Sequence, residues 1–334
     1  MKARAIALLS GGLDSTLACY LIKKQNIELE AVNFVTIFCT CTSKDSSCLA
    51  SQRAADQLGI KLKVFNISEE YLEVIREPKY GYGKNMNPCI DCRIFMFKKA
   101  KRYMEESEAD FVITGEVLGE RPMSQHMRAM RIVEKEAGLQ GLILRPLSAK
   151  FFPKTEPEKK GIIDRERLLK FCGRSRKPQI KLANEIGIKE YPCSGGGCLL
   201  TDFNFSVKLK DLLTHGIFDF ENARLLKIGR HFRLSKNTKL VIGRNEEENK
   251  ILATFLGNGD ICLKNENFAG PVSLLRGNIE DGLIELSAML TAAFGKGKSE
   301  PLVSVVYWGS HSKENIIKVK PLGREKISIY KIGG

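Results

Sequence analysis

A short glycine-containing segment near the start of the chain constrains the fold more than any other feature. Residues 3–9 form an apolar run, residues 10–15 read Ser-Gly-Gly-Leu-Asp-Ser, and apolar residues then recur at helical spacing from Leu13 to Leu21. Glycines let a backbone approach a ligand closely, and a helix N-terminus offers unpaired N–H groups and a positive dipole end. We therefore predict a strand, an anion-binding turn and a helix.

Strand-like and helical patterns continue to alternate after this unit. We predict further strands at 29–38, 61–67, 111–114 and 142–146, and helices at about 49–58, after Ser68, and at 89–106. This alternation indicates an α/β fold with a doubly wound parallel sheet, covered on both faces and carrying its ligand crevice at the carboxyl ends of the strands. We assign this domain to residues 1–148.

The remainder of the chain has a different pattern of predicted secondary structure. Residues 149–203 are predicted to be a helical, basic extension. Residues 204–334 contain β-rich runs at 239–243, 260–263, 301–308, 316–319 and 327–330, with one helix near 283–293. A length of 334 residues suits two domains, and we expect the second to be a smaller α+β domain.

The N-terminus superficially resembles a signal peptide, because two basic residues precede a short apolar run. That run ends at the glycine turn without a small-x-small cleavage pattern, and no stretch of about 18 apolar residues follows. We therefore expect a cytoplasmic protein that does not enter a membrane. Disulfides are rare in the cytoplasm, so the ten cysteines require another explanation.

The basic charge of the chain is concentrated in one segment. Residues 145–181 hold twelve basic and four acidic residues, so this segment carries +8 of a net charge of +14. Such a patch usually faces a phosphate backbone, and the alternative is a solvated pair of charged helices. Arg174 and Arg176, next to Gly173, carry guanidinium groups that can each form paired hydrogen bonds with a phosphate, and this favours RNA as the partner. The predicted RNA-contacting residues are Arg145, Lys150, Arg174, Arg176, Lys177 and Lys181.

The polar residues of the glycine turn suit a polyphosphate with a metal ion. Ser10 and Ser15 can donate hydroxyls to phosphate oxygens, whereas Asp14 would repel bare phosphate and therefore fits a Mg²⁺ ligand. The turn matches neither the P-loop nor the dinucleotide fingerprint. It resembles the pyrophosphate loop of the N-type ATP pyrophosphatases, which cleave ATP to AMP and pyrophosphate while adenylating a substrate. The alternative is an ordinary capped helix start.

This resemblance implies an ATP site. The loop residues would be Ser10, Gly11, Gly12, Asp14 and Ser15. Thr114, Gly115 and Glu116 would return to the same crevice, and Asn33 and Phe34 would lie near the adenine.

Two cysteine elements suggest sulfur or metal chemistry. Cys89 and Cys92 form a C-x-x-C at a helix start, which fits a metal or cluster, a redox dithiol, or two core thiols. The second element runs from Cys193 through three glycines to Cys198, and the four histidines are too scattered for a zinc site. We predict that Cys89, Cys92 and Cys198 hold three corners of a 4Fe–4S cluster, with Cys193 as the competing third ligand.

The other cysteines have weaker assignments. Cys39, Cys41 and Cys48 cluster after the second predicted strand, where an auxiliary thiol site is the less favoured interpretation. Cys19, Cys172 and Cys262 are predicted to be buried apolar residues.

The motifs together resemble the pyrophosphate-loop tRNA thiolation enzymes. They are SGGLDS, NPCIDC, TGEVLGERPMSQ, LRPLSAK and GGGCLLTD, within residues 1–215. The nearest type is 2-thiouridylase-like, with kinship to 4-thiouridine synthetases and to cluster-dependent thiolation enzymes. The resemblance implies that Cys89, Cys92 and Cys198 match the three cysteines, and that Arg121, Ser124 and Gln125 belong to a segment closing over the nucleotide. Residues 228–233 and 241–246 resemble an NFACT-R RNA-binding module.

The implied activity is ATP-dependent thiolation of a tRNA uridine. ATP would adenylate a ring carbonyl oxygen, and sulfur from a donor such as sulfide or a persulfide carrier would replace it, with Asp14, Cys89 and Cys198 as catalytic residues. Three alternatives stay open: a persulfide and disulfide cycle without a cluster, a ligase or amidotransferase acting on a small molecule, and a non-catalytic RNA-binding protein. A homodimer is compatible with the sequence.

Overall fold

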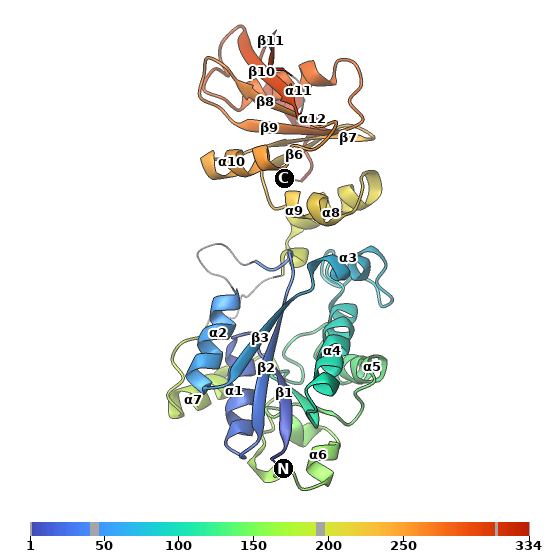
Figure 1. Ribbon diagram of the computed structural model, residues 1–334, viewed down its shortest axis with the longest axis vertical. Helices are drawn as coiled ribbons and strands as arrows, with labels where there is room; N and C mark the ends of the chain where they lie inside the picture. Colours follow the sequence, from blue (N-terminus) through green and yellow to red (C-terminus); the bar gives the residue numbers. More distant parts are fainter. Residues whose placement is uncertain (1, 41–46, 192–197, 311–312, 334) are drawn as a thin grey trace. The chain divides into compact units, whose positions relative to one another are not determined.

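The computed structural model describes residues 2–40, 47–191, 198–310 and 313–333. The chain divides into two compact units, residues 1–201 and 202–334, shown in Figure 1. None of the helices within the described ranges is long and apolar enough to cross a membrane.

A five-stranded parallel sheet forms the centre of the first unit. Its order is β3-β2-β1-β4-β5, and every neighbouring pair is parallel. The strands are β1 (Arg4–Leu8), β2 (Glu28–Val35), β3 (Lys61–Asn66), β4 (Phe111–Thr114) and β5 (Ile143–Leu144). All five lie where the alternating pattern predicts them, and the expected doubly wound α/β fold is confirmed.

Helices cover both faces of this sheet, because alternate strand residues point to opposite sides. Ala5 and Ala7 pack towards the helices α1 and α2, whereas Ile6 packs towards α4 and α5. Figure 1 shows α1 and α2 on one side of the strands and α4 and α5 on the other. The helices of this part are α1 (Leu13–Lys23), α2 (Ser47–Leu58), α3 (Ser68–Arg76), α4 (Cys89–Glu106) and α5 (Met127–Ala137).

The segment that follows β5 is less helical than expected. It contains short turns of 3₁₀-helix and a four-residue helix before one longer helix, and prolines at 153 and 157 interrupt it. The longer helix packs its buried Ala183 into a core with Leu13 and Leu17 of α1. The elements are η1 (Ala149–Phe151), α6 (Glu156–Lys159), η2 (Arg165–Arg167), α7 (Lys177–Glu185) and η3 (Leu199–Thr201).

The second unit is an antiparallel sheet of order β11-β10-β8-β9-β7-β6. Its strands are β6 (Arg230–Ser235), β7 (Thr238–Ile242), β8 (Ile261–Asn265), β9 (Val272–Gly277), β10 (Val303–Gly309) and β11 (Asn315–Val319). Its helices are α8 (Phe203–His215), α9 (Phe220–Leu225), α10 (Glu246–Thr254), α11 (Leu283–Ala293) and α12 (Arg324–Tyr330). The expected α+β class is confirmed.

One predicted strand of this unit is wrong. Residues 327–330 lie in the helix α12, which begins after Gly323. Ile327 and Tyr330 are three residues apart and both pack against the core formed by the sheet and α11. This spacing is helical, and the short alternation of apolar and polar residues concealed it.

Candidate nucleotide and thiol site

The glycine turn lies where the strand order reverses. β2 and β3 extend the sheet on one side of β1, while β4 and β5 extend it on the other. Leu8 at the end of β1 pairs with Thr114 at the end of β4, so the segments that follow both strands start side by side. Such a reversal opens the crevice in which doubly wound sheets bind ligands.

Two glycines allow the surrounding segments to close around this turn. Gly11 has φ +77°, and a Cβ atom there would lie 2.3 Å from the carbonyl carbon of Ala50 in α2. A Cβ atom at Gly115 would lie 2.4 Å from the backbone nitrogen of Ser15. Ser15 Oγ donates to the Gly12 carbonyl over 2.9 Å and lies 3.2 Å from Ser10 Oγ. The structure thus places the 114–116 turn directly against the start of α1.

Asp14 lies in a partly buried cluster with a second carboxylate, Glu120. Burial raises the pKa of Asp14, and the Arg176 guanidinium opposes that rise. Burial and the charge of Asp14 also raise the pKa of Glu120. Arg176 Nη2 donates to Asp14 Oδ2 over 3.3 Å, and Gln179 Nε2 donates to Glu120 over 3.4 Å. Neither carboxylate is fully neutralised by its neighbours.

Two oxygen atoms of this cluster are available to bind a cation. Asp14 Oδ1 and Gln179 Oε1 are buried and form no hydrogen bond to any described residue. Mg²⁺ is usually held by one or two carboxylates together with substrate phosphates. The donor set of Asp14, Glu120 and Gln179 therefore fits the Mg²⁺ that the turn predicts.

Sequence reasoning missed Glu120 and Gln179, and it placed Arg176 elsewhere. Arg176 was predicted to contact RNA, but its guanidinium lies against Asp14 and Glu120. The 162 residues that separate Arg176 from Asp14 hid this contact. Only the packing of α7 on α1 brings the two together.

Arg145 is also misplaced in the predicted RNA-contacting set. Its side chain is 2% exposed, and its Nε lies 3.1 Å from Glu116 Oε2. Nη1 pairs with Glu134, and Arg93 reaches the other oxygen of Glu116 at 3.3 Å. Arg145 is therefore an internal ion-pair residue, and Glu116 holds two arginines in place.

The other predicted RNA contacts lie at the surface. Lys150 pairs with Glu166 at 3.0 Å, and Lys181 lies 3.9 Å from Glu185. Arg174 and Lys177 are exposed at the start of α7, and no ion pair is recorded for either within the described residues. These two cations are the most available for a phosphate backbone.

Asn33 and Phe34 point to opposite faces of the sheet. Asn33 donates to Ser51 of α2 over 2.7 Å, whereas Phe34 stacks on Phe65 in the core beneath α4. Successive strand residues alternate in this way, so the two side chains lie on different faces of the sheet. Phe34 is a core residue.

The charge of Arg121 reaches both the nucleotide turn and the C-x-x-C element. Its charge acts on Asp14 and also on Cys89. Gln125 holds the Arg121 backbone, accepting from its N–H over 3.1 Å and donating to its carbonyl over 2.9 Å. Ser124 and Gln125 are buried, whereas Arg121 itself is exposed. These contacts position Arg121 at the edge of both groups of residues.

The thiols gather at the start of α4. Cys89 opens that helix, Cys92 follows one turn later, and Cys198 is paired with Cys39 in an isolated antiparallel bridge. Burial raises the pKa of Cys198 to about 12, and the thiols of Cys92, Cys39 and Cys89 act on it. Burial also raises the pKa values of Cys89 and Cys92, while Arg93 opposes both rises. Four cysteines are thus close enough to influence one another.

The described cysteines do not form a ready metal site. No group of three or more His, Cys, Asp or Glu residues in the described ranges is arranged to hold a metal ion. Cys41 and Cys193 lie outside those ranges, as does the side chain of Cys48. Cys19 and Cys262 are buried as expected, but Cys172 is exposed, which corrects its prediction. The predicted 4Fe–4S cluster gains no support from this geometry.

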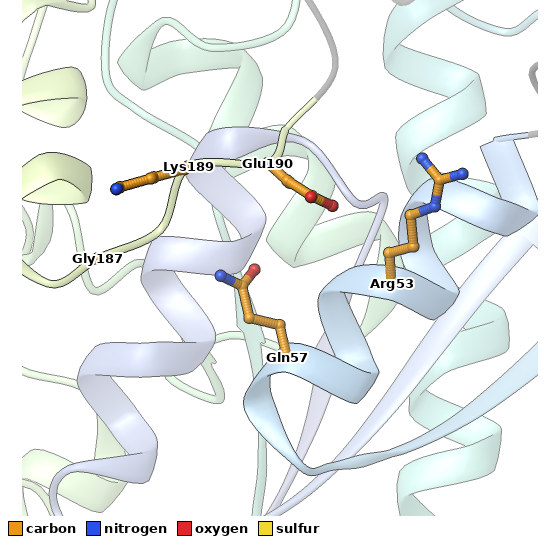
Figure 2. Close-up of a pocket in the computed structure, with 5 residues that line it drawn as sticks. All are labelled: Arg53, Gln57, Gly187, Lys189 and Glu190. Atoms are coloured by element: carbon orange, nitrogen blue, oxygen red, sulfur yellow. The ribbon is translucent and has the colours of Figure 1, made fainter.

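A separate cavity of about 300 Å³ lies between α2 and the segment after α7. Figure 2 shows Arg53 and Gln57 on α2 and Lys189 and Glu190 on the facing segment. None of the predicted nucleotide or thiol residues lines it.

The sequence matches known families in two separate regions. Residues 1–151 match the family model described as thiamine biosynthesis protein (ThiI), and residues 229–331 match the one described as NFACT protein RNA binding domain.

Similar curated proteins include tRNA-specific 2-thiouridylases named MnmA. The protein of Sulfurimonas denitrificans is 31% identical over 119 residues, which is 34% of this chain and 35% of the relative. The protein of Pseudomonas putida is 26% identical over 251 residues, which is 71% of this chain and 63% of the relative. The chain thus spans between 35% and 63% of the length of these two relatives.

Two solved structures were also found to be similar. A 4-thiouridine synthetase in complex with RNA and ATP is 24% identical, with a TM-score of 0.36, covering 56% of this chain and 50% of that one. The C-terminal part of a fibronectin/fibrinogen-binding protein of Streptococcus suis is 14% identical, with a TM-score of 0.29, covering 73% of this chain and 89% of that one. The sequence matches show three similarities: residues 1–151 are similar to the thiamine biosynthesis protein (ThiI) family, the chain is similar to MnmA tRNA-specific 2-thiouridylases, and residues 229–331 are similar to the NFACT protein RNA binding domain.

Proposed function

We propose that this protein is an ATP-dependent tRNA thiolation enzyme that replaces a uridine carbonyl oxygen with sulfur. The carrying observation is the ion pair that joins Arg93, next to Cys92 on α4, to Glu116 over 3.3 Å, because Glu116 follows the Gly115 turn that packs against the start of α1. An adenylation site and a sulfur site must meet at one substrate atom, and this arrangement lets them do so. The matches to ThiI and MnmA support the same reaction class.

In the first step, the nucleotide turn activates the uridine. A ring carbonyl oxygen is a poor leaving group, so its adenylation by ATP makes the later displacement feasible. The N-terminus of α1 and the Ser10 and Ser15 hydroxyls bind the phosphates, and Asp14, Glu120 and Gln179 would hold Mg²⁺. Bound there, Mg²⁺ would neutralise negative charge on the pyrophosphate.

Two arginines complete this half of the site. Arg176 lies 3.3 Å from Asp14, and the charge of Arg121 also acts on this carboxylate. Guanidinium groups bind phosphate oxygens through paired N–H donors. Both side chains are therefore suited to stabilise the negative charge that develops as the α-phosphorus is attacked.

In the second step, a thiol at the cysteine group delivers sulfur. A 4Fe–4S cluster on Cys89, Cys92 and Cys198 would supply an iron that binds sulfide, but the described side chains are not arranged for it. A persulfide held on one cysteine needs no such arrangement and is the sulfur carrier we propose. The outer persulfide sulfur attacks the activated ring carbon, and AMP leaves with the original oxygen. Attack of a second thiol on the cysteine sulfur then breaks the sulfur–sulfur bond, which releases the thiouridine and leaves a disulfide.

The tRNA is proposed to contact both units. Arg174 and Lys177 lie near the start of α7, the helix that also provides Gln179 to the nucleotide site. Residues 229–331 match an RNA-binding domain. Contacts of these kinds would hold the tRNA backbone while one uridine enters the crevice.

The test is nucleoside mass spectrometry of tRNA from a strain lacking the gene. We expect one thiouridine to disappear, and to return with the wild-type gene but not with Asp14→Asn. An unchanged nucleoside profile, together with ATP turnover by the purified protein without RNA, would refute tRNA thiolation in favour of a small-molecule ligase. Iron and sulfide analysis after anaerobic purification decides the cluster separately.

A further inference from the structure

The two faces of the antiparallel sheet in the second unit are covered differently. On one face, α11 packs over a core to which all six strands contribute. On the other face, α9 and α10 pack on Val241 of β7, Cys262 of β8 and Leu274 of β9. Trp308 of β10 packs against this second core and is partly exposed. On this face, β11 and much of β10, at one edge of the sheet (Figure 1), therefore extend beyond the core that α9 and α10 cover.

Strand pairing identifies the side chains that share a face with Trp308. Trp308 pairs with Cys262, whose side chain lies in the core under α9 and α10. Val306, two residues earlier in β10, faces the same way and pairs with Lys264 of β8 and Ile316 of β11. Lys264 is exposed, and Ile316 is 57% exposed. An aromatic ring, a cation and an apolar side chain thus lie together on an open part of the sheet.

Two lysines give this surface a positive charge. Lys264 Nζ lies 5.4 Å from the centre of the Trp308 ring. Lys318 lies on the same face of β11 and is exposed, and no ion pair is recorded for either lysine within the described residues. The acidic Glu266 and Glu314 lie just outside the ends of β8 and β11. The charge on the strands themselves is therefore complementary to a phosphate backbone.

We propose that Trp308, Lys264, Ile316 and Lys318, which we call the Trp308 face, bind single-stranded RNA with one base stacked on the Trp308 ring. This inference rests on the proposed function, in which a tRNA contacts the second unit. Proteins bind unpaired nucleotides by stacking bases on aromatic rings while cations contact the phosphates. A cation–π contact at an exposed site is weaker than base stacking on the same ring, so a base can displace Lys264 and leave its ammonium group free for a phosphate.

The first test is the intrinsic fluorescence of the full-length protein. The chain contains one tryptophan, so its emission reports on the Trp308 face alone. A base that stacks on the indole quenches this emission, and we therefore expect poly(U) and tRNA to quench it. The poly(A)·poly(U) duplex should leave it unchanged, because its bases are already stacked inside a helix. Lys264→Gln should lower the salt slope of poly(U) binding by about 0.7 for the lost phosphate contact.

The second test compares two exposed isoleucines of the same unit. Ile316 lies on the Trp308 face, whereas Ile329 is 74% exposed on α12, which packs beside β6 at the opposite edge of the sheet. Ile316→Glu should weaken poly(U) binding, measured by anisotropy of labelled RNA, and Ile329→Glu should not. Trp308→Leu should weaken it by about 5- to 150-fold, the loss expected for one stacked base, and Trp308→Phe should recover part of that loss. Because Ile316 is exposed, its variant keeps the test decisive even if Trp308→Leu unfolds.

Three results would overturn the proposal. They are unchanged Trp308 fluorescence when poly(U) is bound, equal affinities of Ile316→Glu and Ile329→Glu for poly(U), and self-association of the chain that Ile316→Glu abolishes. The last result would assign the Trp308 face to a second copy of the chain. Unchanged thiouridine in the deletion strain would refute the proposed function, whereas the fluorescence titration would still decide whether the Trp308 face binds single-stranded RNA.

Discussion

Substitution of Arg145 by methionine separates an RNA-binding role from an internal one. The sequence places Arg145 in the most basic segment of the chain, but the structure places it among Glu116, Glu134 and the Phe152 ring. We expect Arg145→Met to destabilise the first unit and to leave the affinity for RNA unchanged. Methionine keeps much of the side-chain volume, so the loss reports on charge rather than on a cavity.

The expected loss of stability follows from burial. Arg145 is 2% exposed and Glu116 3% exposed, so the substitution leaves a carboxylate with little access to water. Removing one partner of a buried pair typically costs about 3–5 kcal/mol. Arg93 remains 3.3 Å from Glu116, which favours the lower end of that range. For a unit of this size the loss corresponds to a fall in Tm of roughly 6–20 °C.

The measurement combines urea unfolding with RNA titration at several salt concentrations. Adding Glu116→Gln to Arg145→Met should restore part of the stability, because the uncompensated charge is removed. Lys177→Ala is the matched surface control. It should leave Tm unchanged, weaken RNA binding and lower the salt slope by roughly 0.9 for the lost phosphate contact. A stable Arg145→Met protein with weaker RNA binding and a reduced slope would refute the structural assignment.

Further predictions concern the nucleotide turn and its neighbours. Glu120→Gln should raise the Mg²⁺ concentration needed for pyrophosphate release, measured by metal titration. The increase should be at least the roughly 10- to 100-fold loss of metal affinity that follows removal of an outer-shell partner. The pKa of Glu120 is raised above its ordinary value of 4.5 in the folded state, so ionisation of Glu120 destabilises the fold as the pH rises above that value. Without Mg²⁺, Glu120→Gln should therefore be more stable than wild type at pH 7 and should lose this advantage as the pH falls towards 4. An equal difference at both pH values would contradict the carboxylate pair. Gly115→Ala should displace the start of α1, since its Cβ would lie 2.4 Å from Ser15 N, and cost about 1–3 kcal/mol with weaker ATP binding by calorimetry. Normal ATP affinity of Gly115→Ala would show that the turn accommodates the added methyl group without displacing α1.

The fold could be predicted from the sequence because its signals are local. A buried strand such as residues 111–114 and a helix such as residues 89–106 are each specified within a few residues of themselves. The helix α5 was missed although its signals are also local: His126 accepts a hydrogen bond from the Ala129 N–H, and Gly138 ends the helix in the left-handed conformation. Its many charged residues obscured the apolar face made by Met130 and Val133.

The site was harder to predict because its members come from distant segments. Ser10 to Ser15 are contiguous and carry a recognisable pattern, whereas Arg176 reaches Asp14 only through the packing of α7 on α1. Basic charge in a sequence does not show which guanidinium faces water. Arg145 and Arg174 share one segment, yet one is buried between carboxylates and the other is exposed.

Two arginines link the electrostatics of the nucleotide turn to those of the thiols. Arg121 acts on the carboxylates of Asp14 and Glu120, and both Arg121 and Arg93 act on Cys89. ATP would bring its own negative charge to Arg121 and so draw that guanidinium towards the phosphates. Arg93 is held by the buried Glu116 and would stay beside the thiols. The positive charge that stabilises the Cys89 thiolate would thus be strongest before ATP binds and weaker while the uridine is being adenylated. It would recover as pyrophosphate leaves. Charge would then favour the Cys89 thiolate after pyrophosphate has left, which is the order that the proposed reaction requires.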